Sequence, residues 1–175
     1  MNSQVNNTKN DSTDFRLLTT NLLPTTFCNK ITPNSTLYVT DFVNESNLDN
    51  QSELGFLLSN ELKVNLLKNN CSKNVMIKTF DLAQNLKMGR NGAKILTREL
   101  SKLKTQSIED DKQIVIGSYS LTNKKIILFV KLVNLKDGNT IASNSSSDEL
   151  TDEIKELEGI KDLDNSQSIK KPFHL

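Results

Sequence analysis

The middle of the chain begins with a strand pattern and continues with a helix pattern. Residues 37–43 are aromatic or β-branched almost without interruption, which is typical of a strand buried on both faces. After a polar loop, Asn50 and Glu53 resemble a helix N-cap pair, and a leucine then recurs at every fourth position. These leucines are Leu54, Leu58, Leu62 and Leu66. The pattern predicts a helix of about five turns that ends near Asn69 and is buried along one stripe.

A second strand and a second helix are predicted next. Residues 75–80 have a short strand pattern, and the order strand, helix, strand favours parallel pairing through a right-handed crossover. Residues 89–92 contain two glycines and break the chain. Apolar residues then recur at helical spacing, which predicts a second helix over residues 93–104.

The third part of the domain reads as an antiparallel meander. Residues 114–121 and 126–133 are strand-like and flank a turn at Asn123 and Lys124, which predicts a hairpin. Asp137 and Gly138 then indicate a tight turn, since glycine tolerates a positive φ, and a third strand is expected over residues 140–144. The expected fold class is α/β, bordering on α+β, with a β-α-β-α-β-β-β mixed sheet and its helices on one face.

Both ends of the chain differ in composition from this domain. Residues 1–14 are polar and too poor in apolar surface to offset the entropy of ordering, so a disordered linker is expected. Residues 15–35 form a lead-in, in which an apolar run closed by Pro24 predicts a short helix that packs onto the domain; binding to a partner is the alternative. The domain covers residues 36–146. Residues 147–175 are expected to be an acidic helix and a polar tail.

Length and charge narrow the class of protein. A chain of 175 residues that is 35% hydrophobic can form one ordinary domain with tails. Its formal charge of +1 gives no field that would steer nucleic acid or an anionic membrane toward it. No run approaches the roughly 18 apolar residues of a membrane helix, and no export signal is visible at Met1. Prior removal of a signal by processing or cloning stays open.

The cysteines and the single histidine limit metal chemistry. Cys28 and Cys71 allow one intramolecular disulfide, while two unrelated thiols are the alternative. A structural zinc site needs about four closely spaced ligands, and His174 lies beside the C-terminus. No metal and no cofactor is expected.

Two loop regions have residues that could bind a ligand. Asp41, Glu45 and Asp49 gather around the carboxyl end of the first strand, where α/β proteins often bind ligands, but a solvated loop is the preferred interpretation because no metal partners or phosphate loop accompany them. Residues 89–92 precede the second predicted helix and resemble an anion cradle. An ordinary turn is the preferred interpretation there.

The remaining candidates do not form a catalytic set. None of four serines lies in a Gly-x-Ser-x-Gly elbow or has a core histidine as its base. These are Ser59, Ser101, Ser118 and Ser120. Tyr119 is expected to be a core or sheet-face aromatic. The chain is therefore predicted not to be an enzyme, with no catalytic, cofactor-binding or metal-binding residue.

Four segments together resemble the FlgO-type domain of bacterial flagellar outer-membrane lipoproteins. The segments are residues 38–44, 52–55, 96–100 and 117–138, and the resemblance covers residues 36 to about 146. In this resemblance Arg98 matches the arginine of a Ser-Arg pair, with Thr97 in place of the serine. It is expected to form an ion pair that fixes the second helix against the sheet, and a role at an interface is the alternative.

The resemblance implies a non-enzymatic structural or assembly protein of the flagellum that is needed for motility. It implies a place on the periplasmic side of the outer membrane and contacts with other flagellar or envelope proteins, self-association included. Export and a lipid anchor are implied by the resemblance alone, since no lipid-bearing cysteine is visible in this chain and Cys28 lies too deep to be taken as one. The Gly-Ser-Tyr segment also resembles periplasmic lipoproteins, so a regulator of an envelope enzyme or secretion system is the alternative.

Overall fold

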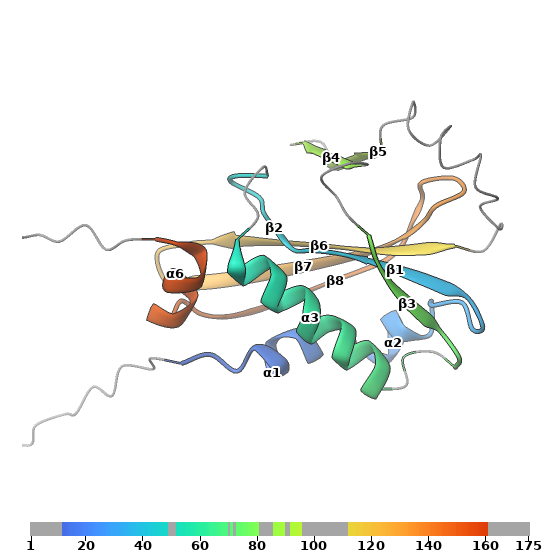
Figure 1. The fold of residues 1–175 in the computed structure, drawn as a ribbon, viewed down its shortest axis with the longest axis horizontal. Helices are drawn as coiled ribbons and strands as arrows, with labels where there is room; N and C mark the ends of the chain where they lie inside the picture. Colours follow the sequence, from blue (N-terminus) through green and yellow to red (C-terminus); the bar gives the residue numbers. More distant parts are fainter. Residues whose placement is uncertain are drawn as a thin grey trace, which may run out of the picture.

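A computed structural model describes residues 12–48, 52–69, 71, 73–80, 86–89, 92–95 and 112–160 (Figure 1). Six of the described strands form a mixed sheet in the order β3-β1-β6-β7-β8, with the short β2 also paired to β6. The strands of this sheet are β1 (Thr36–Thr40), β2 (Val43–Asn44), β3 (Met76–Phe80), β6 (Gln113–Leu121), β7 (Lys125–Asn134) and β8 (Thr140–Glu149). β1 lies parallel to both β3 and β6, whereas β6, β7 and β8 form the predicted antiparallel meander.

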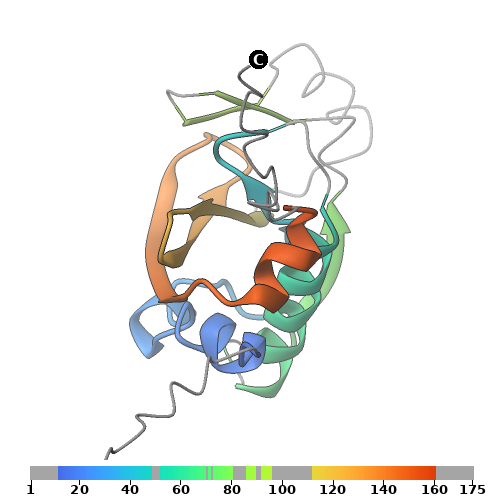
Figure 2. The same ribbon diagram turned by 90° about the vertical axis from the view of Figure 1, so that its left-hand side faces the viewer.

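The described helices cover one face of this sheet, as predicted (Figures 1 and 2). They are α1 (Phe15–Thr20), α2 (Thr25–Cys28), α3 (Glu53–Lys68) and α6 (Asp152–Glu158). The four leucines at every fourth position of α3 are all buried in the main core, together with Leu18 and Leu22 of the lead-in. The lead-in therefore packs onto the domain. On the other face, a smaller cluster contains Ile114, Ile116 and Val133.

The first strand is interrupted, which the sequence did not indicate. β1 ends at Thr40, and β2 resumes at Val43 with β6 as its partner. Between them, the ring of Phe42 is buried over Gly117, where a Cβ atom would lie only 2.6 Å from ring carbons. The prediction of one continuous strand over residues 37–43 was wrong because this aromatic ring packs into the space that a glycine leaves open.

The second predicted helix is wrong where the structure describes it. β4 (Leu86–Gly89) and β5 (Gly92–Ile95) pair antiparallel, with Gly89 opposite Gly92. Two glycines around a two-residue connection favour a hairpin, and this turn chemistry prevails over helical spacing at residues 93–95. The rest of the predicted helix, including Arg98 and Ser101, lies outside the described residues.

Three element boundaries also differ from the prediction. Ser52 is the N-cap of α3, because its Oγ accepts from the backbone N of Gly55 at 3.1 Å, whereas Asn50 lies outside the described residues. β8 continues through the serines to Glu149, since β7 supplies pairing partners along this length. The C-terminal helix consequently begins only after the N-cap Thr151.

Residues 12–14 of the predicted linker are described and contact the rest of the domain. Residues 1–11 of the predicted linker are outside the described residues. Asp14 caps α1 by accepting from the backbone N of Leu17 at 2.9 Å. The Thr13 backbone N donates to Glu153 at 2.7 Å, so the start of the lead-in is tied to α6.

Candidate functional site

Asp41 and Glu45, the two predicted acidic residues that the structure describes, have separate hydrogen-bond partners. Asp41 accepts a hydrogen bond from Ser59 Oγ at 2.8 Å. Glu45 accepts from Ser118 Oγ at 2.9 Å and from Ser120 Oγ at 2.7 Å. Asp49 is outside the described residues. Serine hydroxyl groups of the fold donate to both carboxylates, so each carboxylate binds its own strand or helix of the domain. The interpretation as a solvated loop stays a prediction.

A buried polar network instead forms around Tyr119, which lies on β6. Its hydroxyl group lies 2.7 Å from Ser52 Oγ at the start of α3 and donates to Glu158 at the end of α6. The other oxygen of Glu158 accepts from Asn44 Nδ2 at 2.5 Å. The network therefore joins β2, β6, α3 and α6 at one end of the sheet.

The electrostatics of this network keep the tyrosine protonated. Burial raises the pKa of Tyr119 far above its ordinary value, and the neighbouring Glu158 carboxylate raises it further. A phenol with a raised pKa is a poor base and a poor nucleophile at neutral pH. It acts as a hydrogen-bond donor that holds α6 against the sheet.

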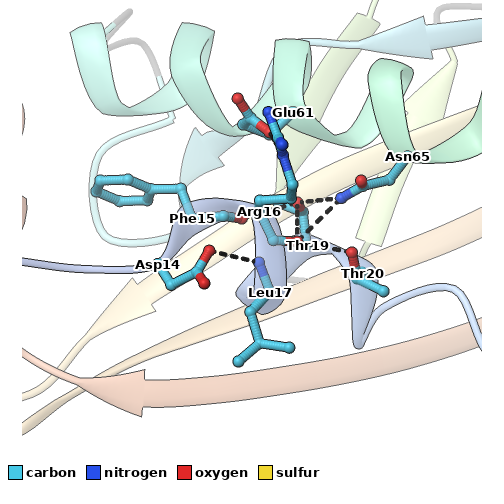
Figure 3. A network of polar contacts seen from close by, with 8 residues as sticks. All are labelled: Asp14, Phe15, Arg16, Leu17, Thr19, Thr20, Glu61 and Asn65. Carbon is cyan, nitrogen blue, oxygen red and sulfur yellow. Dashed lines mark hydrogen bonds and ion pairs between the residues drawn. The ribbon is translucent and has the colours of Figure 1, made fainter. Parts of the chain in front are cut away.

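A second polar network joins α1 to α3 (Figure 3). Asn65 points from α3 toward α1, and its Nδ2 donates to Arg16 O at 3.0 Å and to Thr19 Oγ1 at 2.8 Å. Arg16 Nε lies 3.5 Å from Glu61 Oε2 at a largely exposed position. Leu17 points away from α3 and is 57% exposed. The buried amide of Asn65 thus fixes the lead-in helix on the domain.

The opposite end of α3 carries a disulfide and two small clefts. Cys28 of α2 and Cys71, which follows α3, are disulfide-bonded, so the disulfide is present and the alternative of two unrelated thiols is wrong. Cys28 itself is buried. An apolar cleft of about 230 Å³ is lined by Ile31, Leu37, Leu66, Leu67, Cys71, Asn74, Val75 and Ile77. A neighbouring polar cleft of about 350 Å³ shares Asn74. The first cleft is smaller than typical ligand pockets, and the second lies at their lower limit.

The candidate serines have hydrogen-bond partners that do not activate them. Ser59, Ser118 and Ser120 each donate to a carboxylate, and the only histidine, His174, lies outside the described residues. In the part of the chain that the structure describes, no group of three or more His, Cys, Asp or Glu residues could hold a metal ion. These contacts support a structural use of the polar residues.

Exposed apolar side chains are the remaining features that could serve contact with a partner. They lie on α1, on α3, on β3 and after α6: Leu17, Phe56, Leu67, Met76 and Ile160. Single exposed apolar residues are common on protein surfaces. None of the helices in the described segments is long and apolar enough to cross a membrane.

The network around Tyr119 could not be predicted from the sequence alone. Tyr119 was correctly expected in the core, but Asn44, Ser52 and Glu158 carry no common sequence signal and come together only through the fold. The Ser52 N-cap had a local signal, because serine is a preferred cap residue directly before Glu53.

The fold is thus a mixed α/β sheet with helices on one face, and the chain can be assigned to a family. A comparison with protein families matches residues 18–152 to the family described as FlgO protein. The match spans more than half of the 175 residues, so the chain belongs to the FlgO family. The resemblance inferred from the residues is confirmed.

Comparison with individual proteins gives more distant similarities. No curated protein matches the chain. Among solved structures, it is similar to the LpoB C-terminal domain from Salmonella enterica, with 15% identity and a TM-score of 0.48 over 79% of this chain and 100% of that one. It is also similar to the PelC dodecamer from Paraburkholderia phytofirmans, with 10% identity and a TM-score of 0.40 over 68% of this chain and 73% of that one.

Proposed function

We propose that this protein is a non-enzymatic structural or assembly component of the bacterial flagellum that works through protein-protein contacts. The observation that carries the proposal is the FlgO family match over residues 18–152, which includes the end of α1, all of α2 and α3, and the whole antiparallel meander. A match of this extent supports a shared role of the domain, because it involves the packed core and its connections.

The proposed location is the periplasmic side of the outer membrane, with any lipid anchor supplied by a segment outside this sequence. The Cys28–Cys71 disulfide supports this location, because disulfides persist in oxidising compartments such as the periplasm and are rare in the cytosol. The disulfide links α2 to the residue after the long helix and so holds the lead-in on the domain.

The hydrogen bonds of the described polar residues also support a contact-making role. Ser59, Ser118 and Ser120 are bonded to carboxylates, and Tyr119 is a protonated donor inside the fold. These residues bind parts of the domain to one another, which suits a rigid module that presents its surface to partners.

The proposal is tested by deleting the gene and measuring swimming in soft agar, with growth rate as the control. We expect impaired swimming, normal growth and recovery when the wild-type gene is supplied. Normal swimming would contradict the flagellar role. A change in an envelope enzyme or in secretion, with swimming intact, would support the alternative role as a regulator.

Complementation with surface variants would then locate the contact. Leu17→Asp and Leu67→Asp change exposed apolar residues at 57% and 60% exposure, so both variants should fold normally. The matched control is Asn60→Asp, which changes an exposed polar residue of the same helix as Leu67. We expect the control to restore swimming fully and at least one leucine variant to restore it less.

A further inference from the structure

The outer edge of β8 has backbone hydrogen-bonding groups without partners in the described parts of the chain. Leu150 N donates to Lys124 O at 2.8 Å, so these two opposite residues form a hydrogen-bonded pair. In an antiparallel ladder, hydrogen-bonded pairs alternate with pairs that are not hydrogen-bonded. Even-numbered residues of β8 therefore turn their backbone groups toward β7, whereas Ser143, Ser145 and Ser147 turn theirs outward. No described residue hydrogen bonds to these outward groups.

From Ser143 to Ser147 this edge also lacks the usual features that prevent strand pairing, because the one irregularity of the β7-β8 ladder lies at Ile141, before this stretch. β8 has ten residues, Thr140–Glu149, with no lysine, proline or glycine among them, and it lies at the margin of the sheet (Figure 2). The opposite edge strand, β3, has only five residues and places Lys78 at its centre. Edge strands are commonly protected by short length and by lysine, so β3 is protected and β8 is open.

The side chains of β8 leave room for a neighbouring strand. Ser143, Ser145 and Ser147 are exposed, while the inner face of the strand is held by the domain. Asn144 Nδ2, for example, donates to Asn21 O of the lead-in at 3.0 Å. The strand is thus fixed on one side, and no described residue pairs with the backbone of its outer edge.

We propose that β8 pairs with β8 of a second copy of this chain, antiparallel, about a two-fold axis at Ser145. Ser145 then forms a hydrogen-bonded pair with Ser145 of the second copy, and Ser143 pairs with Ser147 on either side of the axis. Three such pairs give roughly six main-chain hydrogen bonds. The two sheets become one continuous sheet, with the helices of both copies on the same face.

The distribution of charge along β8 favours its own copy as the partner. Its two acidic residues, Asp148 and Glu149, both lie at the C-terminal end. Antiparallel pairing about Ser145 places Asp148 opposite Ala142 of the second copy and Glu149 beside the irregular, uncharged stretch at Ile141. Parallel pairing of the same strands would place the carboxylates side by side, and like charges on neighbouring strands are destabilising. The strand is therefore complementary to itself in the antiparallel direction only.

A substitution at the two-fold axis should weaken pairing between the two copies without disturbing the fold of each copy. Ser145→Pro removes an N–H group that points away from β7, and proline is tolerated on an edge strand at such a position. We expect the wild-type chain to sediment as a dimer in analytical ultracentrifugation and Ser145→Pro to dissociate roughly tenfold or more readily, with an unchanged circular dichroism spectrum. Ser145→Thr is the matched control, because it keeps the N–H group and the β propensity, and it should remain dimeric.

Cysteine cross-linking tests the register. In the proposed ladder the two Ser145 Cα atoms are about 5.5 Å apart, which suits a disulfide, whereas the two Ser143 Cα atoms are about 14 Å apart. Ser145→Cys should therefore cross-link to a covalent dimer under mild oxidation, and Ser143→Cys on the same exposed edge should not. Equal cross-linking of both variants would refute the axis.

Two results would overturn the proposal as a whole. They are a wild-type chain that stays monomeric at about 1 mM, and a Ser145→Pro variant that dimerises as strongly as the wild type. The proposal goes beyond the flagellar role and can fail independently of it, because it concerns the purified chain and swimming is not its readout.

Discussion

Replacing Tyr119 with phenylalanine removes one hydroxyl group from the network that joins α6 to the sheet. The ring is fully buried and phenylalanine fills the same space, so no cavity forms and the change isolates the hydrogen bonds. Ser52 still caps Gly55, and Glu158 still accepts from Asn44. Ser52 and Glu158 therefore each keep one hydrogen bond in the variant. Tyr119 loses two hydrogen bonds at about 1 kcal/mol each, which predicts that the unfolding free energy falls by about 2 kcal/mol at pH 7.

The same substitution should change how stability depends on pH. The ordinary pKa of tyrosine is 10.0, and the pKa of Tyr119 in the folded protein is raised above it by burial and by Glu158. Above about pH 10 the unfolded chain releases this proton while the folded chain keeps it, so this contribution to stability is present at lower pH and is lost as pH rises. Above about pH 10 the unfolding free energy should fall by up to about 1.4 kcal/mol per pH unit.

Urea denaturation of both proteins between pH 7 and about pH 11 measures this effect. The difference in unfolding free energy between the wild type and Tyr119→Phe should narrow above pH 10, because the variant lacks the titrating group. Glu158→Gln should lower the pKa of Tyr119, as seen in the ultraviolet absorbance of tyrosinate, which is readable because the chain has two tyrosines and no tryptophan. A stability difference that stays constant or widens above pH 10 would refute the reasoning.

Three further substitutions or treatments test other parts of the fold. Asn65→Ala should cost about 1 to 2 kcal/mol in urea denaturation, because its buried amide bonds two acceptors in the lead-in, whereas Asn60→Ala on the exposed side of α3 should cost under about 0.5 kcal/mol. Leu58→Ala, at a fully buried position, should lower the unfolding free energy by about 2 to 5 kcal/mol, and an unshifted thermal midpoint would contradict its place in the core. Reducing the Cys28–Cys71 disulfide, which closes a loop with a sequence separation of 43, should cost about 4 kcal/mol in denaturation with and without reductant.

The elements that the sequence predicted well are those decided by local periodicity. A leucine at every fourth position can be buried only on a helix with one apolar stripe, and all four leucines of α3 lie in the core. The hairpin of β6 and β7 follows in the same way from two strand-like runs around a two-residue turn, and its register extends from Gln113 to Leu121.

The errors arose where a long-range contact or a competing local signal decided the structure. The interruption after Thr40 depends on Phe42 packing over Gly117, which lies 75 residues away in the chain by residue number. At residues 93–95, helical spacing competed with glycine turn chemistry, and the turn prevailed. The extension of β8 across Ser145 to Glu149 depends on pairing with β7, because serine and asparagine have low strand propensity of their own.

The central claim, a contact-making role in the flagellum, is tested most directly by electron cryotomography of flagellar motors in a deletion strain. We expect motors that lack density or are misassembled at the outer membrane, and normal motors when the wild-type gene is supplied. Intact motors in the deletion strain would contradict the claim.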